Sequence, residues 1–151
     1  MSDLGELYQE LIVDHSRRPR NFKAIQDATA KAEGFNPLCG DRVTVYLKMD
    51  GDVIREVSFE GSGCAISTAS ASLLTETLKG KTLAEAETIF DGFHKLVTGV
   101  AKGIGPEETR LGKLAVFKGV CDYPTRVKCA TLVWHTLRSA LKGDRQPAST
   151  E

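Results

Sequence analysis

The sequence feature that most restricts the fold is a pair of strand-like stretches joined by a tight turn. Apolar residues occupy every second position in residues 43–49, the segment Asp50-Gly51-Asp52 has turn composition, and residues 53–59 return as a second strand. A period of two places the apolar side chains on one face of a strand. Residues 43–59 are therefore predicted to form a β-hairpin with one buried face.

Helical patterns flank the hairpin on both sides. Apolar residues recur at helical spacing in residues 4–15. A second helix is predicted from residue 65 up to Gly80, and small residues dominate its first half. Residues 21–38 hold no period, so we expect them to form a loop lying over the surface.

The C-terminal half is predicted to be mainly helical. Residues 82–85 match a capping box that opens a further helix, and a last helix is expected over residues 124–142, with proline in its first turn. Residues 99–120 are less regular. The tail, residues 143–151, has the composition of a disordered end, which leaves residues 1–142 as a single domain. This order of elements, with one further strand allowed, predicts a small α+β fold.

Composition excludes several function classes. The 151 residues contain 20 basic and 20 acidic side chains, so the formal net charge is zero and no global field recruits nucleic acid or an acidic membrane. The first ten residues are acidic and polar and do not resemble a secretory signal. No apolar run approaches the roughly 20 residues of a membrane-spanning helix. We therefore expect a cytoplasmic protein.

Cysteines are the side chains that point to chemistry. In a reducing compartment, a cysteine is more often a metal ligand or a catalytic group than half of a disulfide. The alternative is that a cysteine serves simply as a small buried apolar side chain. Cys39 precedes the hairpin, Cys64 lies between its second strand and a helix, and Cys129 lies in the first turns of the last helix. Such element ends can converge in a small domain. Two of the three adjoin helix N-termini, where thiolate is favoured over thiol.

Asp41 is a fourth candidate ligand. It follows Cys39 by two residues, and the glycine between them allows both side chains to face one point. Three thiolates and one carboxylate make a tetrahedral set for zinc, and soft sulfur ligands also suit iron and iron–sulfur clusters. A hydrogen-bonded turn residue is the alternative role for Asp41. No CxxC pair is present, so the spacing alone indicates a metal site only weakly.

Three segments resemble the signature segments of the IscU-type iron–sulfur assembly scaffolds. They are Pro37-Leu38-Cys39-Gly40-Asp41, the Gly-Ser-Gly-Cys-Ala-Ile-Ser run at residues 61–67, and Val127-Lys128-Cys129. The likeness spans nearly the whole chain, from the first helix to about residue 142. It implies an α+β fold with a small antiparallel three-stranded sheet packed against several helices. The metal-site residues that it implies are Cys39, Asp41, Cys64 and Cys129.

Within that family the sequence resembles the SufU branch. Lys128 stands where IscU proteins carry a histidine, the proline-rich chaperone segment is altered at residues 123–128, and residues 99–120 resemble the insertion that marks SufU. This resemblance implies a tightly held zinc ion and service as sulfur acceptor for the cysteine desulfurase SufS, alongside other iron–sulfur assembly proteins. Any sulfurtransferase activity would then require the desulfurase. The alternative is a scaffold on which an iron–sulfur cluster is assembled, with iron or the cluster in place of zinc.

Cys39 is the predicted sulfur acceptor, because its loop can move whereas Cys64 and Cys129 are tied to helices. Arg126 lies three residues before Cys129 on the same helix face. Two roles stay open for Arg126: a solvated side chain, or a positive charge that stabilises the thiolates.

The remaining candidates receive ordinary roles. Cys121 belongs to no signature segment and is predicted to be a spare or partly buried thiol. His15, His94 and His135 are expected to pack or to lie on the surface, and the arginines in residues 17–20 are expected to be solvated. No histidine is near the three motif cysteines in sequence, which disfavours a third hypothesis, an independent thiol hydrolase that needs a general base.

Overall fold

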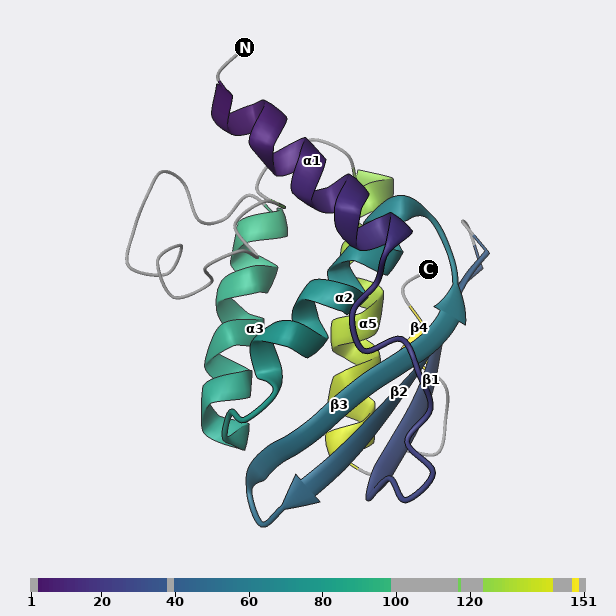
Figure 1. The fold of residues 1–151 in the computed structure, drawn as a ribbon, viewed down its shortest axis with the longest axis vertical. Helices are drawn as coiled ribbons and strands as arrows, with labels where there is room; N and C mark the ends of the chain where they lie inside the picture. Colours follow the sequence, from purple (N-terminus) through teal and green to yellow (C-terminus); the bar gives the residue numbers. More distant parts are fainter. Residues whose placement is uncertain (1–2, 38–39, 99–116, 118–123, 143–147, 150–151) are drawn as a thin grey trace.

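Three antiparallel strands and the helices packed against them make up the domain. The computed structural model describes residues 3–37, 40–98, 117, 124–142 and 148–149. The elements shown in Figure 1 are α1 (Asp3–Arg17), β1 (Ala30–Asn36), β2 (Asp41–Asp50), β3 (Val53–Ser62), α2 (Ala65–Leu78), α3 (Leu83–Thr98), α5 (Pro124–Lys142) and β4 (Ala148–Ser149). Among these residues no helix is long and apolar enough to cross a membrane.

The sheet has the strand order β3-β2-β1-β4. The predicted hairpin is present as β2 and β3, and β1 pairs antiparallel with β2 so that Asn36 lies opposite Asp41. The two residues of β4 pair parallel with β1. They fall in the tail that the sequence predicted to be disordered, and the rest of that tail lies outside the described residues.

The predicted surface loop over residues 21–38 was wrong in its second half, where β1 forms. The inward positions of β1 include Ala32, Gly34 and Asn36. These side chains are small or polar, so the strand carries no apolar alternation that sequence reasoning could detect. Small residues are required here because Gly34 faces Thr136 of α5 so closely that any side chain would overlap it.

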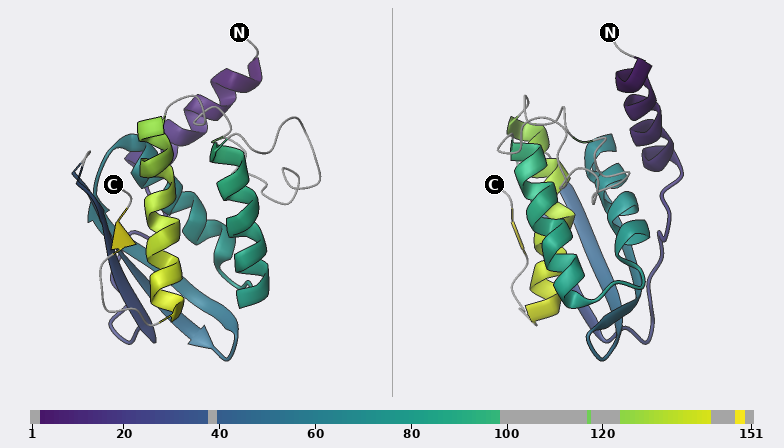
Figure 2. Two further views of the ribbon diagram at one scale, coloured as in Figure 1. Left: turned by 180° about the vertical axis from the view of Figure 1, so that it is seen from behind. Right: turned by 90° about the vertical axis from the view of Figure 1, so that its left-hand side faces the viewer.

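Helices cover one face of the sheet. Helix α5 packs against β1 and β2, and α2 packs against β3 and α5. Helix α1 lies against α2, and α3 lies against α5 (Figure 2). The core between these layers is centred on Trp134, which is fully buried and stacks on Phe93 with ring centroids 4.7 Å apart. Phe117 meets the edge of Phe93 and is also fully buried.

The small residues of α2 serve close helix packing, as predicted. Residues 69–72 are all buried. The hydroxyl of Ser70 donates to the carbonyl of Ala130 at 2.6 Å and accepts from the indole N–H of Trp134 at 3.3 Å. Because Cys64 precedes α2 and Ala130 follows Cys129, this contact fixes the distance between the helices that carry two of the cysteines.

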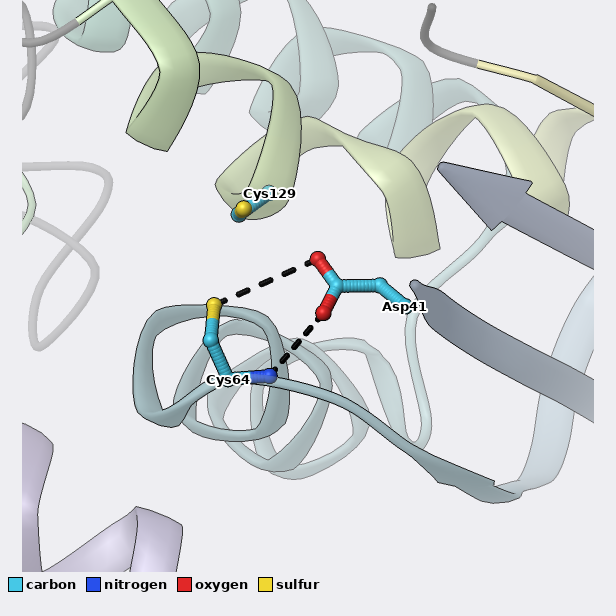
Figure 3. Close-up of side chains that lie close together, drawn as sticks. All are labelled: Asp41, Cys64 and Cys129. Carbon is cyan, nitrogen blue, oxygen red and sulfur yellow. Dashed lines mark hydrogen bonds between the residues drawn. The ribbon is translucent and has the colours of Figure 1, made fainter. Parts of the chain in front are cut away.

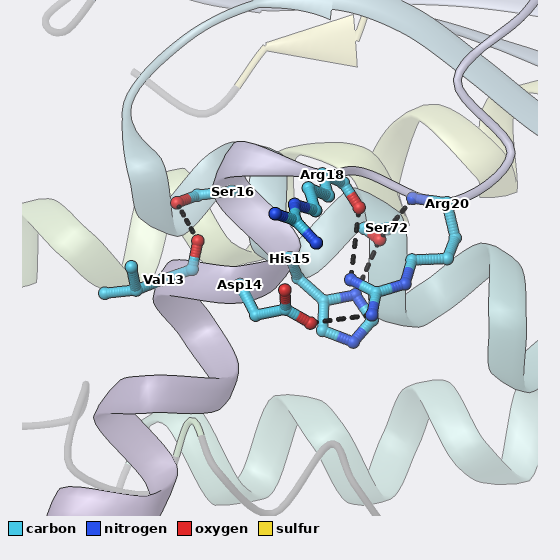
Figure 4. A network of polar contacts seen from close by, with 7 residues as sticks. All are labelled: Val13, Asp14, His15, Ser16, Arg18, Arg20 and Ser72. Atoms are coloured by element: carbon cyan, nitrogen blue, oxygen red, sulfur yellow. Dashed lines mark hydrogen bonds and ion pairs between the residues drawn. The ribbon is translucent and has the colours of Figure 1, made fainter.

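Helix α1 is fastened to α2 by a polar network (Figure 4). His15 is 1% exposed, and its Nδ1 lies 2.6 Å from the hydroxyl of Ser72. The backbone N–H of Arg20 donates to the same hydroxyl at 2.8 Å, and the Arg20 guanidinium forms an ion pair with Asp14 at 2.6 Å. His15 thus has one of the two ordinary roles expected from the sequence, packing, and the chain that leaves α1 is held on α2, the helix that Cys64 caps.

The predicted capping box at the start of α3 is formed. The backbone N–H of Thr82 donates to the Glu85 carboxylate at 3.1 Å, and the N–H of Glu85 donates to the Thr82 hydroxyl at 3.2 Å. These bonds satisfy backbone donors that a helix N-terminus leaves unpaired. The hydrogen bonds to Thr82 lower the pKa of Glu85.

Candidate metal centre

Three elements bring Asp41, Cys64 and Cys129 together (Figure 3). Asp41 opens β2, Cys64 is the N-cap of α2, and Cys129 lies in the second turn of α5. One ligand atom from each side chain lies within 4.8 Å of the others. Three of the four predicted ligands therefore converge. The fourth, Cys39, and the spare thiol Cys121 lie outside the described residues.

Asp41 has the hydrogen-bonding role that the sequence left open, and it also lies beside the sulfurs. Its carboxylate is fully buried, and Oδ1 accepts a hydrogen bond from the backbone N–H of Cys64 at 2.9 Å. Oδ2 lies 4.0 Å from Sγ of Cys64. One carboxylate oxygen thus fixes the start of α2, while the other faces the sulfurs.

Two glycines allow this approach. A Cβ on Gly63 would lie 2.7 Å from Asp41 Oδ1, which is too close for the carboxylate to keep its place. Gly40 has φ +72°, and its N–H donates to the carbonyl of Asn36 at 2.8 Å across the turn between β1 and β2. Positive φ favours glycine, so this residue lets the chain turn directly before Asp41.

The two described sulfurs differ in exposure. Cys64 is exposed, and its Sγ accepts from the backbone N–H of Ser67 at 3.4 Å, as an N-cap side chain does. Cys129 is 3% exposed, and the side-chain amide of Asn36 donates to its Sγ at 4.0 Å. The centre therefore opens to solvent on the Cys64 side and is closed on the Cys129 side.

Sequence reasoning missed Asn36. The residue directly precedes the Pro37–Asp41 segment, yet a neutral amide carries no signal of ligation, and its contact with Cys129 spans 93 positions of the chain. Only the packing of α5 on β1 brings the two side chains together.

The donor set fits a thiophilic cation. Two thiolates and a carboxylate are preferred ligands of zinc, and three such groups leave a tetrahedral ion one further position. If both cysteines bind as thiolates beside the buried Asp41, three negative charges lie close together, and a bound cation would offset them. Asp41, Cys64 and Cys129 are the residues that could hold the metal.

The other sequence candidates lie elsewhere or keep an open role. Arg126 is exposed in the first turn of α5, and the structure places it three residues before Cys129. His94 and His135 pack against Phe90, with ring centroids 6.2 and 5.7 Å away. Burial lowers the pKa of His135, and the nearby charges of His94 and Arg138 act in the same direction.

A family comparison agrees with this geometry. Residues 7–130 match the family described as the NifU-like N terminal domain. The chain belongs to that family. The matched range contains every residue of the candidate centre, so the cluster of Asp41, Cys64 and Cys129 lies within the NifU-like domain.

Individual relatives of this NifU-like domain carry two kinds of name. The zinc-dependent sulfurtransferase SufU of Bacillus subtilis is 36% identical over 140 residues, which cover 93% of this chain and 92% of that protein. The iron–sulfur cluster assembly scaffold protein IscU of Streptococcus pyogenes is 37% identical over 142 residues, which cover 94% of this chain and 87% of that protein. The two identities are nearly equal, so identity alone does not choose between zinc and a cluster.

Solved structures confirm the predicted fold class. A putative iron–sulfur cluster assembly scaffold protein for the SUF system from Fervidobacterium islandicum superposes with a TM-score of 0.81 at 41% identity, covering 90% of this chain and 97% of that one. The three-stranded antiparallel sheet and its covering helices are therefore the family fold, as the resemblance of the signature segments implied.

Proposed function

We propose that this protein serves iron–sulfur cluster assembly as a zinc-bound sulfur acceptor for a SufS-type cysteine desulfurase. The observation that carries the proposal is the convergence of Asp41, Cys64 and Cys129 within 4.8 Å at the meeting of three elements. The similar SufU of Bacillus subtilis is named a zinc-dependent sulfurtransferase, which supports zinc as the metal. The protein would act in the cytoplasm, where thiols stay reduced, and pass sulfur to other assembly proteins.

Cys39 would complete the ligand set. Consecutive Cα atoms lie 3.8 Å apart, so the Cα of Cys39 is within about 7.6 Å of the Cα of Asp41 through Gly40. That reach is sufficient for a thiol to share an ion with the Asp41 carboxylate. The proposed ligands are Cys39, Asp41, Cys64 and Cys129.

Sulfur would move by persulfide exchange. Bound zinc would hold the cysteines as thiolates and reduce their nucleophilicity until the partner docks. The Cys39 thiolate attacks the outer sulfur of the persulfide on the desulfurase cysteine, and the sulfur–sulfur bond of that persulfide breaks. The desulfurase cysteine leaves as a thiolate, and the outer sulfur remains on Cys39 as a new persulfide. No net oxidation or reduction occurs.

The environments of the other thiols support Cys39 as the acceptor. The Cys64 sulfur caps α2 through the N–H of Ser67, and Cys129 is buried in α5. An attack by either would disturb a helix. Arg126 would stabilise the thiolates through its charge, which makes it secondary to the nucleophile.

A cluster scaffold is the second candidate function. The similar IscU of Streptococcus pyogenes is named a scaffold, and the same sulfurs could hold an iron–sulfur cluster as cargo. Metal analysis and visible absorption of the freshly purified protein separate the two. A colourless protein with about one zinc per chain supports the sulfur acceptor, whereas a brown protein with iron and sulfide supports the scaffold.

The functional test measures alanine released by a SufS-type desulfurase from cysteine. The wild-type protein should accelerate release, Cys39→Ser should abolish the acceleration, and Arg126→Ala should weaken it less. Cys121→Ser is the matched control and should behave as wild type. Acceleration that survives Cys39→Ser would refute the proposed acceptor, and a wild-type protein without effect would refute the proposed function.

A further inference from the structure

The side chain of Asn36 points into the metal centre. Asn36 ends β1 and is fully buried, on the strand face that packs against α5. Its Nδ2 lies 4.0 Å from Sγ of Cys129 in a buried contact. An amide nitrogen is only a donor, so the contact directs an N–H at the sulfur.

The backbone around Asn36 holds this amide in place. Its carbonyl accepts from the N–H of Gly40 at 2.8 Å, and Asn36 lies opposite Asp41 in the β1–β2 register. The Asp41 carboxylate on β2 therefore contacts the sulfur of Cys64, while the Asn36 amide on the neighbouring strand β1 contacts the sulfur of Cys129. Each described sulfur has its own polar neighbour from the same end of the sheet.

A hydrogen bond to a thiolate changes its chemistry. The N–H draws electron density from the sulfur, which makes the sulfur a weaker nucleophile and fixes its direction. Groups that hydrogen-bond to metal ligands commonly set the ligand's orientation and strength. Cys129 combines this bond with burial, whereas Cys64 is exposed.

We propose that Asn36 is a positioning residue that keeps Cys129 on the metal while another cysteine exchanges sulfur. This inference rests on the proposed function of the same centre. The amide fixes Cys129 as the permanent anchor of the ion. Cys39 then exchanges sulfur while Cys129 stays on the metal. Asn36 helps to separate these two roles without contacting the transferred sulfur.

Two variants remove the donor in different ways. Asn36→Leu keeps the branched arrangement of heavy atoms but is larger and has no hydrogen-bonding group, and Asn36→Asp keeps the shape but offers acceptors. Thr136→Val is the matched control, because it removes a buried hydroxyl from the same α5–β1 contact without reaching a sulfur. Far-ultraviolet circular dichroism and urea unfolding of each protein establish that it is folded.

The first measurement is the sulfur-to-metal charge-transfer band of the cobalt(II)-substituted protein. Loss of the N–H should raise the energy of the sulfur lone pair and move the band to lower energy in both Asn36 variants. The second is alkylation of the zinc-bound protein, mapped by mass spectrometry. Relative to Cys64, Cys129 should react about 10–100-fold faster in the variants, the range by which neighbours of metal ligands alter a site. Thr136→Val should change neither measurement.

An unchanged band and an unchanged ratio of Cys129 to Cys64 alkylation in the folded variants would overturn the role of Asn36. If neither variant folds, the wild-type protein loaded with cadmium-113 decides: scalar coupling between the metal and the Asn36 amide protons supports the role, and its absence refutes it. A wild-type protein that binds no metal refutes the proposed function as well. If the wild-type protein holds zinc and relays sulfur, and both Asn36 variants match it in the charge-transfer band and in the alkylation ratio, only the role of Asn36 is refuted.

Discussion

The Asp41 carboxylate makes two contacts with Cys64, one to its backbone N–H and one to its sulfur. Oδ1 of Asp41 accepts the N–H of Cys64 at 2.9 Å, and Oδ2 lies 4.0 Å from the Cys64 sulfur. The carboxylate thus fixes the start of α2 and faces the metal centre at once. Two consequences, one for stability and one for metal binding, can be separated by substitution.

Asp41→Asn should lose metal affinity but keep an acceptor for the N–H of Cys64, whereas Asp41→Ala should lose both. In the metal-free protein, Asp41→Ala should lower the free energy of unfolding by about 1.5–3 kcal/mol, the range for a lost hydrogen bond to a charged group. Asp41→Asn should lose less. Urea unfolding with and without zinc measures both effects, and equal destabilisation by the two variants would contradict the structural role of Oδ1.

Gly63→Ala should weaken zinc binding although it replaces no ligand. The added methyl would lie 2.7 Å from Asp41 Oδ1, so the carboxylate must move away from Cys64. Zinc affinity, measured by competition with a chelator, is expected to fall about tenfold or more.

Gly51→Ala is the control for this variant. Gly51 has φ +64° in the β2–β3 turn with open space around it, so alanine should cost about 1 kcal/mol of backbone strain and leave zinc affinity unchanged. Equal zinc affinities in the two variants would contradict the importance of the Gly63–Asp41 contact.

Removal of zinc should lower the melting temperature without abolishing the fold. The core around Trp134 and Phe93 is built from side chains outside the centre, so the domain retains its own source of stability. A ligand at 1,000 times its dissociation constant contributes about 4 kcal/mol, which is worth roughly 10 °C for a domain of this size. Thermal melts before and after chelation measure the shift, and an unchanged melt after verified metal removal would argue against the site.

Stability should fall below neutral pH partly through His135. Burial lowers the pKa of His135 in the folded protein, so below about 6.5 the unfolded chain binds a proton that the folded protein does not. The contribution of His135 is complete above that pH and is lost as the pH falls toward the folded pKa. His135→Gln should therefore lose less stability than wild type between pH 7.5 and pH 5.5 in urea unfolding.

His94→Gln tests the cause of this pH dependence. The charge of His94 is a smaller cause than burial, so this variant should keep most of the dependence. A wild-type-like pH profile in His135→Gln would contradict the role of His135.

Much of the fold followed from local patterns. The alternation in residues 43–49 located β2, and the Thr82–Glu85 capping box located the start of α3. Strand β1 was missed because its inward positions are small or polar, a consequence of the close approach of Gly34 to α5. That requirement comes from a neighbour more than a hundred residues away and leaves no local period.

The site residues could be predicted from the sequence only where they lie in segments that resemble the family's signature segments. Asp41 and Cys64 are 23 positions apart, and spacing alone gives no reason for them to meet. The family resemblance supplied the ligand set, and the structure brings together its three described members. Asn36 had no comparable signal, because a buried amide acquires its partner only when α5 packs on the sheet.

Persulfide mapping tests the proposed sulfur relay most directly. The zinc-bound protein is mixed with a SufS-type desulfurase and cysteine, persulfides are trapped with an alkylating agent, and each cysteine is located by mass spectrometry. The trapped sulfur should lie on Cys39, while Cys64 and Cys129 remain in the metal centre. Persulfide found chiefly on Cys64, Cys121 or Cys129 would contradict the assignment.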